Sequence, residues 1–165
     1  MEVVVRTAGY GDAPRVASLL DGLVAEVGAQ RGGAELVADH LDLVRSAVVD
    51  DLLAAEVTTE RRVVVGTVEG AVVGVAAARH RPADGGRRGV VECCYVEPAA
   101  RRVGIGEALL ADVVDWLGRS ECDGVDGLAL PGRRDAKSLF EATGFKARLL
   151  VMHRSLERDP PGPAG

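Results

Sequence analysis

Two kinds of hydrophobic spacing alternate along the chain and predict the order of its helices and strands. The β-branched run Val3 to Val5 predicts a strand that ends before Gly9. Asp12 and Pro14 follow, which we interpret as a helix N-cap and an early-turn proline. Apolar residues then recur at helical spacing, so we expect an amphipathic first helix. The residues on its apolar stripe are Val16, Leu19, Leu20, Leu23 and Val27.

A second helical region is predicted from Ala34 to Glu56, with a break near Ser46. Its carboxylates fall outside the apolar positions, so we expect them to face solvent. They are Asp39, Asp42, Asp50, Asp51 and Glu56.

Valine-rich runs in the middle of the chain predict three strands. Residues 62–80 contain two such runs divided by Glu69 and Gly70, which is typical of a hairpin with a tight turn. Residues 81–88 contain proline and glycine and are expected to form a loop. Residues 89–96 are the third β-rich run.

The last third of the chain alternates helix and strand. A helix is predicted after Gly104, a strand over 125–130, a helix over 133–143 that Gly144 closes, and a final strand over 145–156. The helix after Gly104 has an apolar face formed by Ile105, Leu109, Val113, Trp116 and Leu117. This order predicts an α/β (α+β) fold with mixed strand directions.

Length and composition indicate one domain without a membrane span. The chain has 165 residues, 47% of them hydrophobic, which is enough for one core. We assign residues 1–156 to this domain and expect 157–165, which is rich in proline, to be a disordered tail. No stretch approaches the roughly 18 apolar residues of a membrane helix, and no signal sequence precedes the first strand. We therefore expect a soluble, cytoplasmic protein.

Charge and cysteine content narrow the possible partners. The formal net charge is -5 and aromatic residues make up 3%, which argues against a nucleic-acid partner. The three cysteines, two of them adjacent at Cys93 and Cys94, show neither a paired framework nor zinc spacing. We expect reduced thiols and no metal.

The glycine turn at residues 101–107, Arg-Arg-Val-Gly-Ile-Gly-Glu, carries the clearest chemical signal. The first turn of a helix leaves backbone N–H groups free to bind phosphate oxygens, and Arg101 and Arg102 can add charge-assisted contacts. Leu109 stands where a dinucleotide fingerprint needs its third glycine, and no Lys-Ser or Lys-Thr pair completes a P-loop. The alternative is an ordinary strand-to-helix turn.

These residues resemble the GNAT family of N-acetyltransferases. The family signature is Gln or Arg, two residues, Gly, one residue, then Gly or Ala, and Arg101, Gly104 and Gly106 match it. Residues 95–98, Tyr-Val-Glu-Pro, are similar to the end of the family's preceding strand. Residues 136–145, Ala-Lys-Ser-Leu-Phe-Glu-Ala-Thr-Gly-Phe, are similar to its late helix and Gly-Phe exit.

The resemblance implies a mostly antiparallel central sheet with helices on both faces and a strand splay at the acyl-CoA site. It also implies acetyl-CoA as co-substrate, with its pyrophosphate on the N–H groups of residues 102–107 and its pantetheine arm beside residues 94–96. The cofactor-binding residues expected on this basis are Cys94, Tyr95, Val96, Arg101, Arg102, Val103, Gly104, Ile105, Gly106, Glu107 and Arg133.

Glu92 is the candidate general base, because an attacking amine must lose a proton to a carboxylate or imidazole. Strand alternation places Glu92, Cys94 and Val96 on one face, and some members of the GNAT family carry a catalytic Glu on this strand. The alternative for Glu92 is a salt-bridged or solvent-facing side chain. His80 and His153 are further candidate bases, each with an ordinary structural or surface role as its alternative.

Phe140 departs from the family pattern. Many members have a Tyr there that protonates the leaving thiolate, and phenylalanine cannot donate a proton. Tyr95 or water would have to replace it. Arg133 stands where the family often has Asn, and a covalent route through Cys93 or Cys94 is disfavoured because no His is near in sequence.

Three functions follow in order of preference. The first is transfer of an acetyl group from acetyl-CoA to a primary amine, by direct attack; the acidic charge favours a cationic amine. The second, motivated by Phe140, is a non-catalytic acyl-CoA-binding or interaction module. The third, a nucleotide-binding regulatory domain, lacks the required third glycine. The predicted last strand, if exposed over 148–156, could pair across a homodimer.

Overall fold

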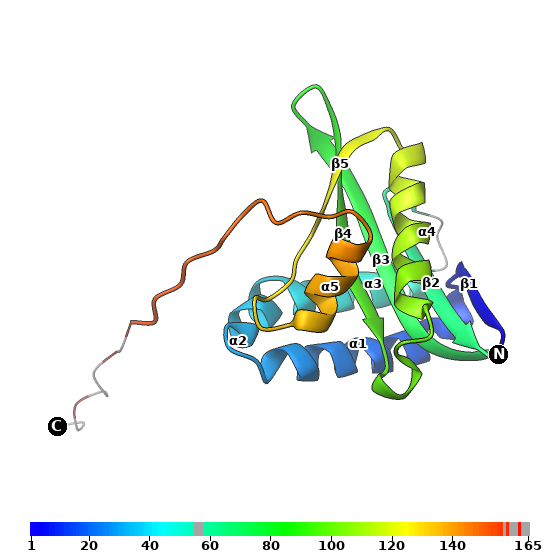
Figure 1. The fold of residues 1–165 in the computed structure, drawn as a ribbon, viewed down its shortest axis with the longest axis horizontal. Helices are drawn as coiled ribbons and strands as arrows, with labels where there is room; N and C mark the ends of the chain where they lie inside the picture. Colours follow the sequence, from blue (N-terminus) through cyan, green and yellow to red (C-terminus); the bar gives the residue numbers. More distant parts are fainter. Residues whose placement is uncertain (55–57, 157, 159–161, 163–165) are drawn as a thin grey trace.

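A computed structural model describes residues 1–54, 58–156, 158 and 162 of the chain. Within these residues five strands form one sheet, flanked by helices (Figure 1). In spatial order the strands are β1 (Val3–Thr7), β2 (Arg61–Val68), β3 (Ala71–Ala83), β4 (Gly86–Val96) and β5 (Cys122–Gly127). Neighbouring strands are antiparallel except β4 and β5, which run parallel. The predicted mixed, mostly antiparallel α/β fold is confirmed.

The helices divide between the two faces of the sheet. One face is covered by α1 (Ala13–Gly28), α2 (Gly33–Leu36), a π-helical turn (Val37–Leu41) and α3 (Asp42–Ala54), and the other by α4 (Ile105–Arg119) and α5 (Arg134–Ala142). Short 3-10 turns, Tyr10–Asp12 and Pro98–Ala100, precede α1 and α4. Within the described residues, none of these helices is long and apolar enough to cross a membrane.

The sheet separates two hydrophobic cores, which we call the α1–α3 core and the α4 core. The α1–α3 core includes Val16, Leu20, Leu23, Val48, Val65, Val75, Cys93 and Tyr95. The α4 core includes Val64, Ala76, Val91, Ile105, Leu109, Val113 and Leu117. Consecutive valines of β2 therefore serve opposite cores, because side chains alternate along a strand that is buried on both faces.

The β3–β4 connection is shorter than predicted. The strands extend to Ala83 and from Gly86, so most of the expected loop over residues 81–88 belongs to a long hairpin. The turn is confined to Asp84 and Gly85, which has a φ of 75°. The proline in this segment misled the prediction, since a strand tolerates proline where its missing N–H is not needed. The predicted turn at Glu69 and Gly70, with φ values of 48° and 81°, is confirmed.

Two helical predictions need correction. The break in the second helical region is the π-helical turn Val37–Leu41, whereas Ser46 lies inside α3. Asp12 precedes α1 but its side chain does not cap that helix, because its carboxylate instead accepts the Gly9 N–H at 2.8 Å and pairs with Arg6.

The acidic residues predicted to face solvent in the second helical region are not all exposed. Asp51 is half-buried and pairs with Arg61, whereas Asp39, Asp42 and Asp50 face solvent as expected. Glu56 lies outside the described residues.

Two further strand predictions differ from the structure. The strand expected over 125–130 is β5, which begins at Cys122 and ends at Gly127. The strand expected over 145–156 is wrong, because the described residues of this segment belong to no strand and all of them except Phe145 are exposed. Most of the predicted tail over 157–165 lies outside the described residues.

Gly33 holds the junction between α1 and α2 through a close backbone approach. A Cβ on Gly33 would lie 1.8 Å from the Val27 carbonyl oxygen, so the helices can meet only because this residue has no side chain. Gly118, near the end of α4, is the opposite case. Apart from its chain neighbours and the backbone of its own helix, no described atom lies within 4 Å of the Cβ it lacks.

We predict opposite effects of alanine at these two positions. Gly33→Ala should destabilise the fold by about 1–3 kcal/mol or more, because the backbone of Val27 must move. Gly118→Ala should stabilise it by roughly 0.5–1 kcal/mol, because alanine loses less backbone freedom in a helix. Urea unfolding of both variants measures the effects; equal midpoints would contradict the close approach at Gly33.

Candidate active site

The parallel strands β4 and β5 separate before β4 ends. Their pairing stops at Val91 and Gly127, yet β4 continues to Val96 while the chain after Gly127 turns towards α5. The predicted strand splay is therefore present. A cavity of about 40 Å³, the splay cavity, opens where the strands part. Its wall is formed by Leu23, Val27, Leu36, His40, Leu41, Val91, Glu92, Cys93, Cys94, Leu128, Ala129, Leu130, Arg133, Ala136 and Phe140.

Glu92 is the extra residue of a β-bulge in β4. Ala77 of β3 pairs with Cys93 and Ala78 with Val91, which leaves Glu92 without a partner in the register. Val91 consequently packs in the α4 core and Cys93 in the α1–α3 core, although residues two apart normally share a face.

The bulge overturns the predicted alternation of Glu92, Cys94 and Val96. Cys94 and Val96 contact the α4 core, whereas the Glu92 carboxylate lies with Arg61 on the α3 side. The prediction assumed an unbroken period of two, which the inserted residue shifts by one.

The Glu92 side chain is buried in an ion-paired cluster. Only 6% of the residue is exposed, and its carboxylate oxygens accept hydrogen bonds from Nε and Nη2 of Arg61 at 2.7 and 3.1 Å. Arg79 Nε lies 3.4 Å from the same carboxylate. Arg61 also pairs with Asp51 of α3, and these partners raise the pKa of its guanidinium. The salt-bridged alternative for Glu92 thus describes its environment.

His40 is a candidate base that the sequence reasoning missed. It belongs to the π-helical turn, lines the splay cavity, and places Nε2 3.0 Å from the backbone oxygen of Glu92. Since a carbonyl only accepts, this contact assigns the proton to Nε2 and leaves the Nδ1 lone pair of the neutral ring free. Its position four residues after Leu36 and four before Val44, on an apolar face, was the available signal.

The glycine turn before α4 forms as predicted. Arg102 and Gly104 have φ values of 69° and 84°, and apart from the chain neighbours of Gly104 no described atom lies within 4 Å of a Cβ built on it. Ala108 N–H donates to the Gly104 oxygen at 3.1 Å, so the N–H groups of residues 105–107 precede the first intrahelical bond. This open first turn, at the positive end of a 15-residue helix, fits a phosphate group.

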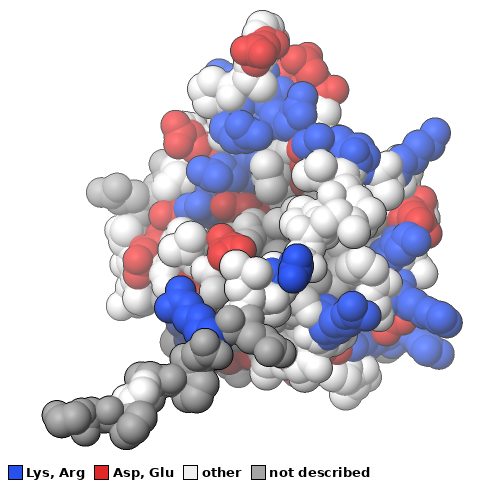
Figure 2. All heavy atoms as spheres, turned by 90° about the vertical axis from the view of Figure 1, so that its left-hand side faces the viewer, with Lys and Arg blue, Asp and Glu red and all other residues white. Residues whose placement is uncertain are grey.

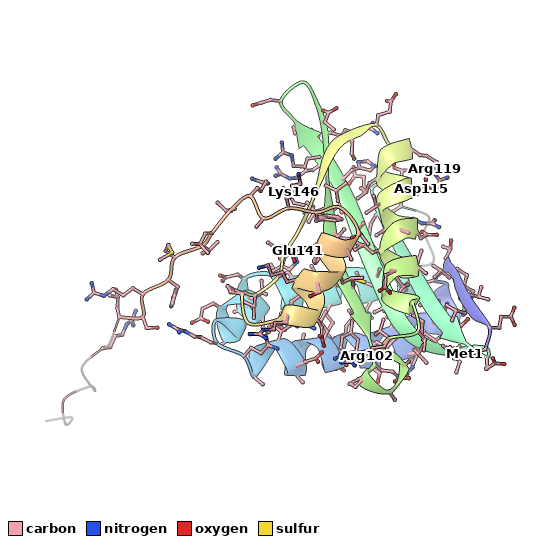
Figure 3. The ribbon with its side chains drawn as sticks, viewed as in Figure 1. Met1, Arg102, Asp115, Arg119, Glu141 and Lys146 are labelled. Carbon is pink, nitrogen blue, oxygen red and sulfur yellow. The ribbon has the colours of Figure 1, made fainter. Side chains whose placement is uncertain are left out.

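The two arginines of the turn have different surroundings. The guanidinium of Arg101 donates two bonds of 2.8 Å to the Glu26 carboxylate, and its Nε donates to the Val96 oxygen at 2.8 Å. Its side chain therefore ties the end of β4 to α1. Arg102 is exposed, lies at the turn between β4 and α4 (Figure 3), and forms no ion pair with a described residue. Arg102 is thus the available cation of the pair.

Arg133 bridges the splay cavity and a neighbouring hollow. Its side chain is 14% exposed, and Nη2 lies 3.4 Å from Glu26 Oε2. The neighbouring hollow, of about 230 Å³, is bordered by Glu26, Gln30, Gly132, Arg133, Arg134 and Asp135. Arg133 precedes α5 directly, so it brings a positive charge to the mouth of the splay.

Phe140 and Tyr95, the two aromatic residues discussed for protonation of the thiolate, lie on different sides of β4. Phe140 lines the splay cavity and stacks edge-on against Phe145, with ring centroids 4.9 Å apart. Tyr95 points to the other side of β4, where its hydroxyl packs against Gly22 of α1 and Arg101 lies 5.5 Å from its ring centroid. Tyr95 does not belong to the splay-cavity wall.

The adjacent cysteines lie on opposite faces of β4, and Cys93 is buried whereas Cys94 is half-buried. Burial raises the pKa of Cys94 to about 12, and it raises the pKa of Cys93 as well. Both thiols therefore stay protonated at neutral pH, which disfavours nucleophilic attack by either. The Cys94 Sγ lies 3.9 Å from the Gly106 oxygen and so links β4 to the start of α4.

The other two histidines have structural or surface positions. His80 Nε2 lies 3.0 Å from the Thr59 oxygen, and its ring packs against Trp116 at 5.4 Å. His153 is exposed on the segment after α5, 3.5 Å from Glu35. Neither lines the splay cavity.

On the side of the molecule seen in Figure 2, basic and acidic side chains are interspersed.

Comparison with known proteins agrees with this geometry. Residues 34–145 match the sequence profile described as the acetyltransferase (GNAT) family. The sequence matches none of the curated proteins.

Solved structures share the fold at low sequence identity. The aminoglycoside N-acetyltransferase AAC(6')-Iy, in complex with CoA, is 18% identical with a TM-score of 0.68, over 93% of this chain and 95% of that chain. A ribosomal-protein-alanine N-acetyltransferase from Brucella melitensis biovar Abortus 2308 is 20% identical with a TM-score of 0.67, over 94% and 100%. A possible acetyltransferase from Clostridium difficile 630 is 19% identical with a TM-score of 0.68, over 96% and 100%.

The Glu26 ion pairs predict a pH-dependent contribution to stability. Hydrogen bonds from Arg101 hold the pKa of Glu26 below its ordinary value of 4.5. A lowered pKa in the folded state means that the ionised carboxylate stabilises the fold above pH 4.5. This contribution is lost as the pH falls through the lowered value.

Glu26→Gln should therefore reduce the unfolding free energy by about 1–2 kcal/mol at pH 7. The difference from the unmodified chain should shrink progressively below pH 4.5. Asp115→Asn, which removes an exposed pair with Arg119 (Figure 3), is the control and should change stability by at most a few tenths. Denaturant titrations from pH 3 to 8 test this; a pH-independent Glu26→Gln effect would contradict it.

Proposed function

Because this chain belongs to the acetyltransferase (GNAT) family, we propose that it transfers an acetyl group from acetyl-CoA to a primary amine. The observation that supports this most directly is the splay of β4 from β5 beside the open first turn of α4. The splay offers unpaired strand backbone for the pantetheine arm of CoA, and the first turn of α4 offers N–H groups for its pyrophosphate. The CoA complex of the structural neighbour AAC(6')-Iy is consistent with this assignment.

The proposed cofactor contacts are mainly backbone contacts. The N–H groups of residues 102–107 would hold the pyrophosphate, and the exposed Arg102 can add a charge-assisted contact. Backbone groups at residues 94–96 would hold the pantetheine arm. Side chains at Cys94, Tyr95, Val103, Ile105 and Glu107 need no contact with the cofactor in this arrangement. Arg133, at the mouth of the splay, can meet a second phosphate or the acceptor.

The chemistry is a direct exchange at the thioester carbonyl. When bound, acetyl-CoA supplies an activated acetyl group; the amine nitrogen bonds to the carbonyl carbon, the carbon–sulfur bond breaks, and the thiolate leaves. The neutral amine loses one proton and the sulfur gains one; an acceptor that arrives as an ammonium ion first loses a further proton to water. The protein must therefore accept a proton from the amine at the splay cavity.

We assign His40 as the group that accepts this proton from the amine. Its Nδ1 has no hydrogen-bond partner among the described residues, and the bond from Nε2 to the Glu92 oxygen holds the ring in place. Glu92, the base predicted from the sequence, remains the alternative acceptor, but both of its carboxylate oxygens already accept bonds from Arg61. Water would protonate the thiolate, since Phe140 cannot.

The acceptor is proposed to be a cationic amine. The net charge of -5 favours such a substrate by long-range attraction. The structural neighbours include an aminoglycoside N-acetyltransferase and a ribosomal-protein-alanine N-acetyltransferase, which defines two classes of amine for a first screen. A cytoplasmic location, where acetyl-CoA and reduced thiols coexist, is part of the proposal.

A non-catalytic acyl-CoA-binding module is the second candidate. It is motivated by Phe140, which occupies the splay-cavity wall without a hydroxyl group. Both candidates require CoA to bind at the glycine turn, and they differ only in turnover.

We predict that acetyl-CoA stabilises the protein and that NAD and ATP do not. At 100 times its dissociation constant a ligand adds about 2.7 kcal/mol, which corresponds to roughly 5–10 °C in melting temperature for a domain of this size. Gly104→Asp should weaken binding by at least about 100-fold, because it places a negative charge beside the pyrophosphate.

Gly104→Asn is the matched control for this experiment. It has nearly the same shape and tolerates the positive φ of 84°, but it carries no charge. Its acetyl-CoA affinity should exceed that of Gly104→Asp by at least about tenfold. Equal affinity of Gly104→Asp and the unmodified protein would remove the pyrophosphate from this turn.

For catalysis we predict that His40→Gln lowers kcat by about 100-fold and leaves acetyl-CoA affinity unchanged. Glutamine can still donate to the Glu92 oxygen but has no basic lone pair. Glu92→Gln should lower the melting temperature, because it breaks the Arg61 pair. Its effect on kcat should be much smaller than that of His40→Gln. Turnover is measured as thiol release with an amine panel that includes an aminoglycoside and a peptide with N-terminal alanine.

Other outcomes reassign the roles clearly. A large loss of kcat in Glu92→Gln, with His40→Gln near normal, would place the base at Glu92. Saturable acetyl-CoA binding with no turnover of any amine would favour the non-catalytic module.

A further inference from the structure

The end of the β3–β4 hairpin extends past the helices on one face of the sheet. In Figure 1 this end lies at the top, whereas α1 and α3 lie across the lower half of the sheet. Arg79, Arg81 and Arg88 belong to the hairpin, and the first two are exposed. The sheet face that α1–α3 cover elsewhere is therefore open to solvent at this end.

These three arginines point to the same side of the sheet. Arg81 and Arg88 are directly opposite each other in the β3–β4 register, and cross-strand partners share a face. His80 packs on the α4 side, so its neighbours Arg79 and Arg81 point to the α1–α3 side. Arg79 Nε accordingly lies 3.4 Å from the carboxylate of Glu92.

A fourth arginine reaches this face from the segment after α5. Arg148 donates to the carboxylate of Asp126 on β5 at 2.7 and 2.5 Å, and Arg88 Nη1 lies 3.9 Å from the same carboxylate. The hydrogen bonds from Arg148, with the charges of Arg88 and Arg81, hold the pKa of Asp126 below its ordinary value of 3.8. We call Arg79, Arg81, Arg88 and Arg148 the arginine patch.

The arginine patch carries more positive charge than the neighbouring carboxylates neutralise. Two of its arginines share Asp126, and Glu92, the partner of Arg79, already accepts two bonds from Arg61. Arg81 forms no ion pair with a described residue. In Figure 2 basic side chains gather in the upper part of the molecule, at the end where the hairpin lies. The surface is thus locally cationic on a chain whose net charge is -5.

The pairing of Arg81 with Arg88 is a cost to the fold. Like charges directly opposite each other destabilise a sheet, so folding alone does not account for this pair. The planar guanidinium group donates two parallel bonds to a carboxylate, and the contact of Arg148 with Asp126 shows this arrangement within the patch. The patch is therefore suited to further carboxylates.

The composition of the chain favours an acidic peptide over a nucleic acid as the ligand. Single-stranded nucleic acids bind through stacking on aromatic side chains, which make up only 3% of this chain. Duplexes require basic groups along many phosphates, whereas the patch spans only the end of a hairpin and the neighbouring strand. The net charge of -5 acts at long range and is screened beyond about 8 Å at physiological ionic strength, so the local arginines decide at contact.

We propose that the arginine patch binds an acidic segment of a partner protein, whose Asp or Glu side chains pair with Arg79, Arg81 and Arg88. The segment would lie across the open sheet face at the end of the hairpin. The patch and the glycine turn are at opposite ends of β4, since the strand begins at the hairpin and ends before the turn. This interaction therefore does not depend on the proposed acetyl transfer.

The test measures fluorescence anisotropy of a labelled hexaglutamate peptide with the full chain, without acetyl-CoA. The unmodified chain should bind saturably, with an affinity that falls as salt is added. Arg81→Gln/Arg88→Gln should weaken binding by at least about tenfold. Arg87→Gln/Arg119→Gln is the matched control, because it removes the same charge from exposed positions outside the patch; Arg87 is on the same hairpin but donates to the Ser120 oxygen after α4. The control should bind within about twofold of the unmodified chain.

Melting temperatures show whether each variant folds, and Arg148→Gln, outside the sheet, replaces the double variant should that fail. No saturable binding by the unmodified chain, or an equal loss in the patch variant and its control, would overturn the proposal. Tighter binding of a labelled hexathymidylate, which has a similar charge, would also overturn it and assign the patch to nucleic acid. Self-association that the patch variant abolishes, in sedimentation at low salt, would assign the patch to a second copy instead.

Discussion

Because β4 carries one residue more than β3 between Val91 and Cys93, the strand changes the facing of its side chains within the candidate site. The inserted Glu92 sends its carboxylate to Arg61 and offers its backbone oxygen to His40. Pairing with β5 stops at the adjacent Val91. One irregularity in a strand thus accompanies the splay, the ion-paired cluster and the position of the imidazole, and the candidate active site depends on it.

The charged residues around the candidate site fall into two groups: those that pair within the protein and those that are available to a ligand. Arg101, which matches the family signature, uses its side chain on Glu26 and the Val96 oxygen and so connects β4 with α1. The open N–H groups that follow it need no side chain, since the first turn of a helix supplies them. The conformation of this turn depends on the positive φ of 84° at Gly104 rather than on the side chains of its neighbours.

Local patterns predicted most of the fold and part of the site. Periodicity identified all five strands and the main helices, and the glycine turn was placed correctly because strand, turn and helix start adjoin in sequence. The bulge at Glu92 was not predictable in this way, because it depends on the register of two strands. The pairing of Arg101 with Glu26 joins residues 75 positions apart. The predicted last strand failed for a related reason, since strand pairing requires a partner that an apolar run cannot identify.

The two cores on opposite faces of the sheet have a consequence for divergence of the protein. Alternating side chains of β2, such as Val64 and Val65, belong to different cores, so the two cores, within the described residues, have no buried side chain in common. Volume changes within α1–α3 are therefore transmitted only weakly to α4 and its glycine turn. Substitutions that reshape the wall formed by Leu23, Leu36 and His40 can accumulate while the opposite layer keeps its packing. The fold thereby allows the α1–α3 side of the splay cavity to vary separately from the glycine turn.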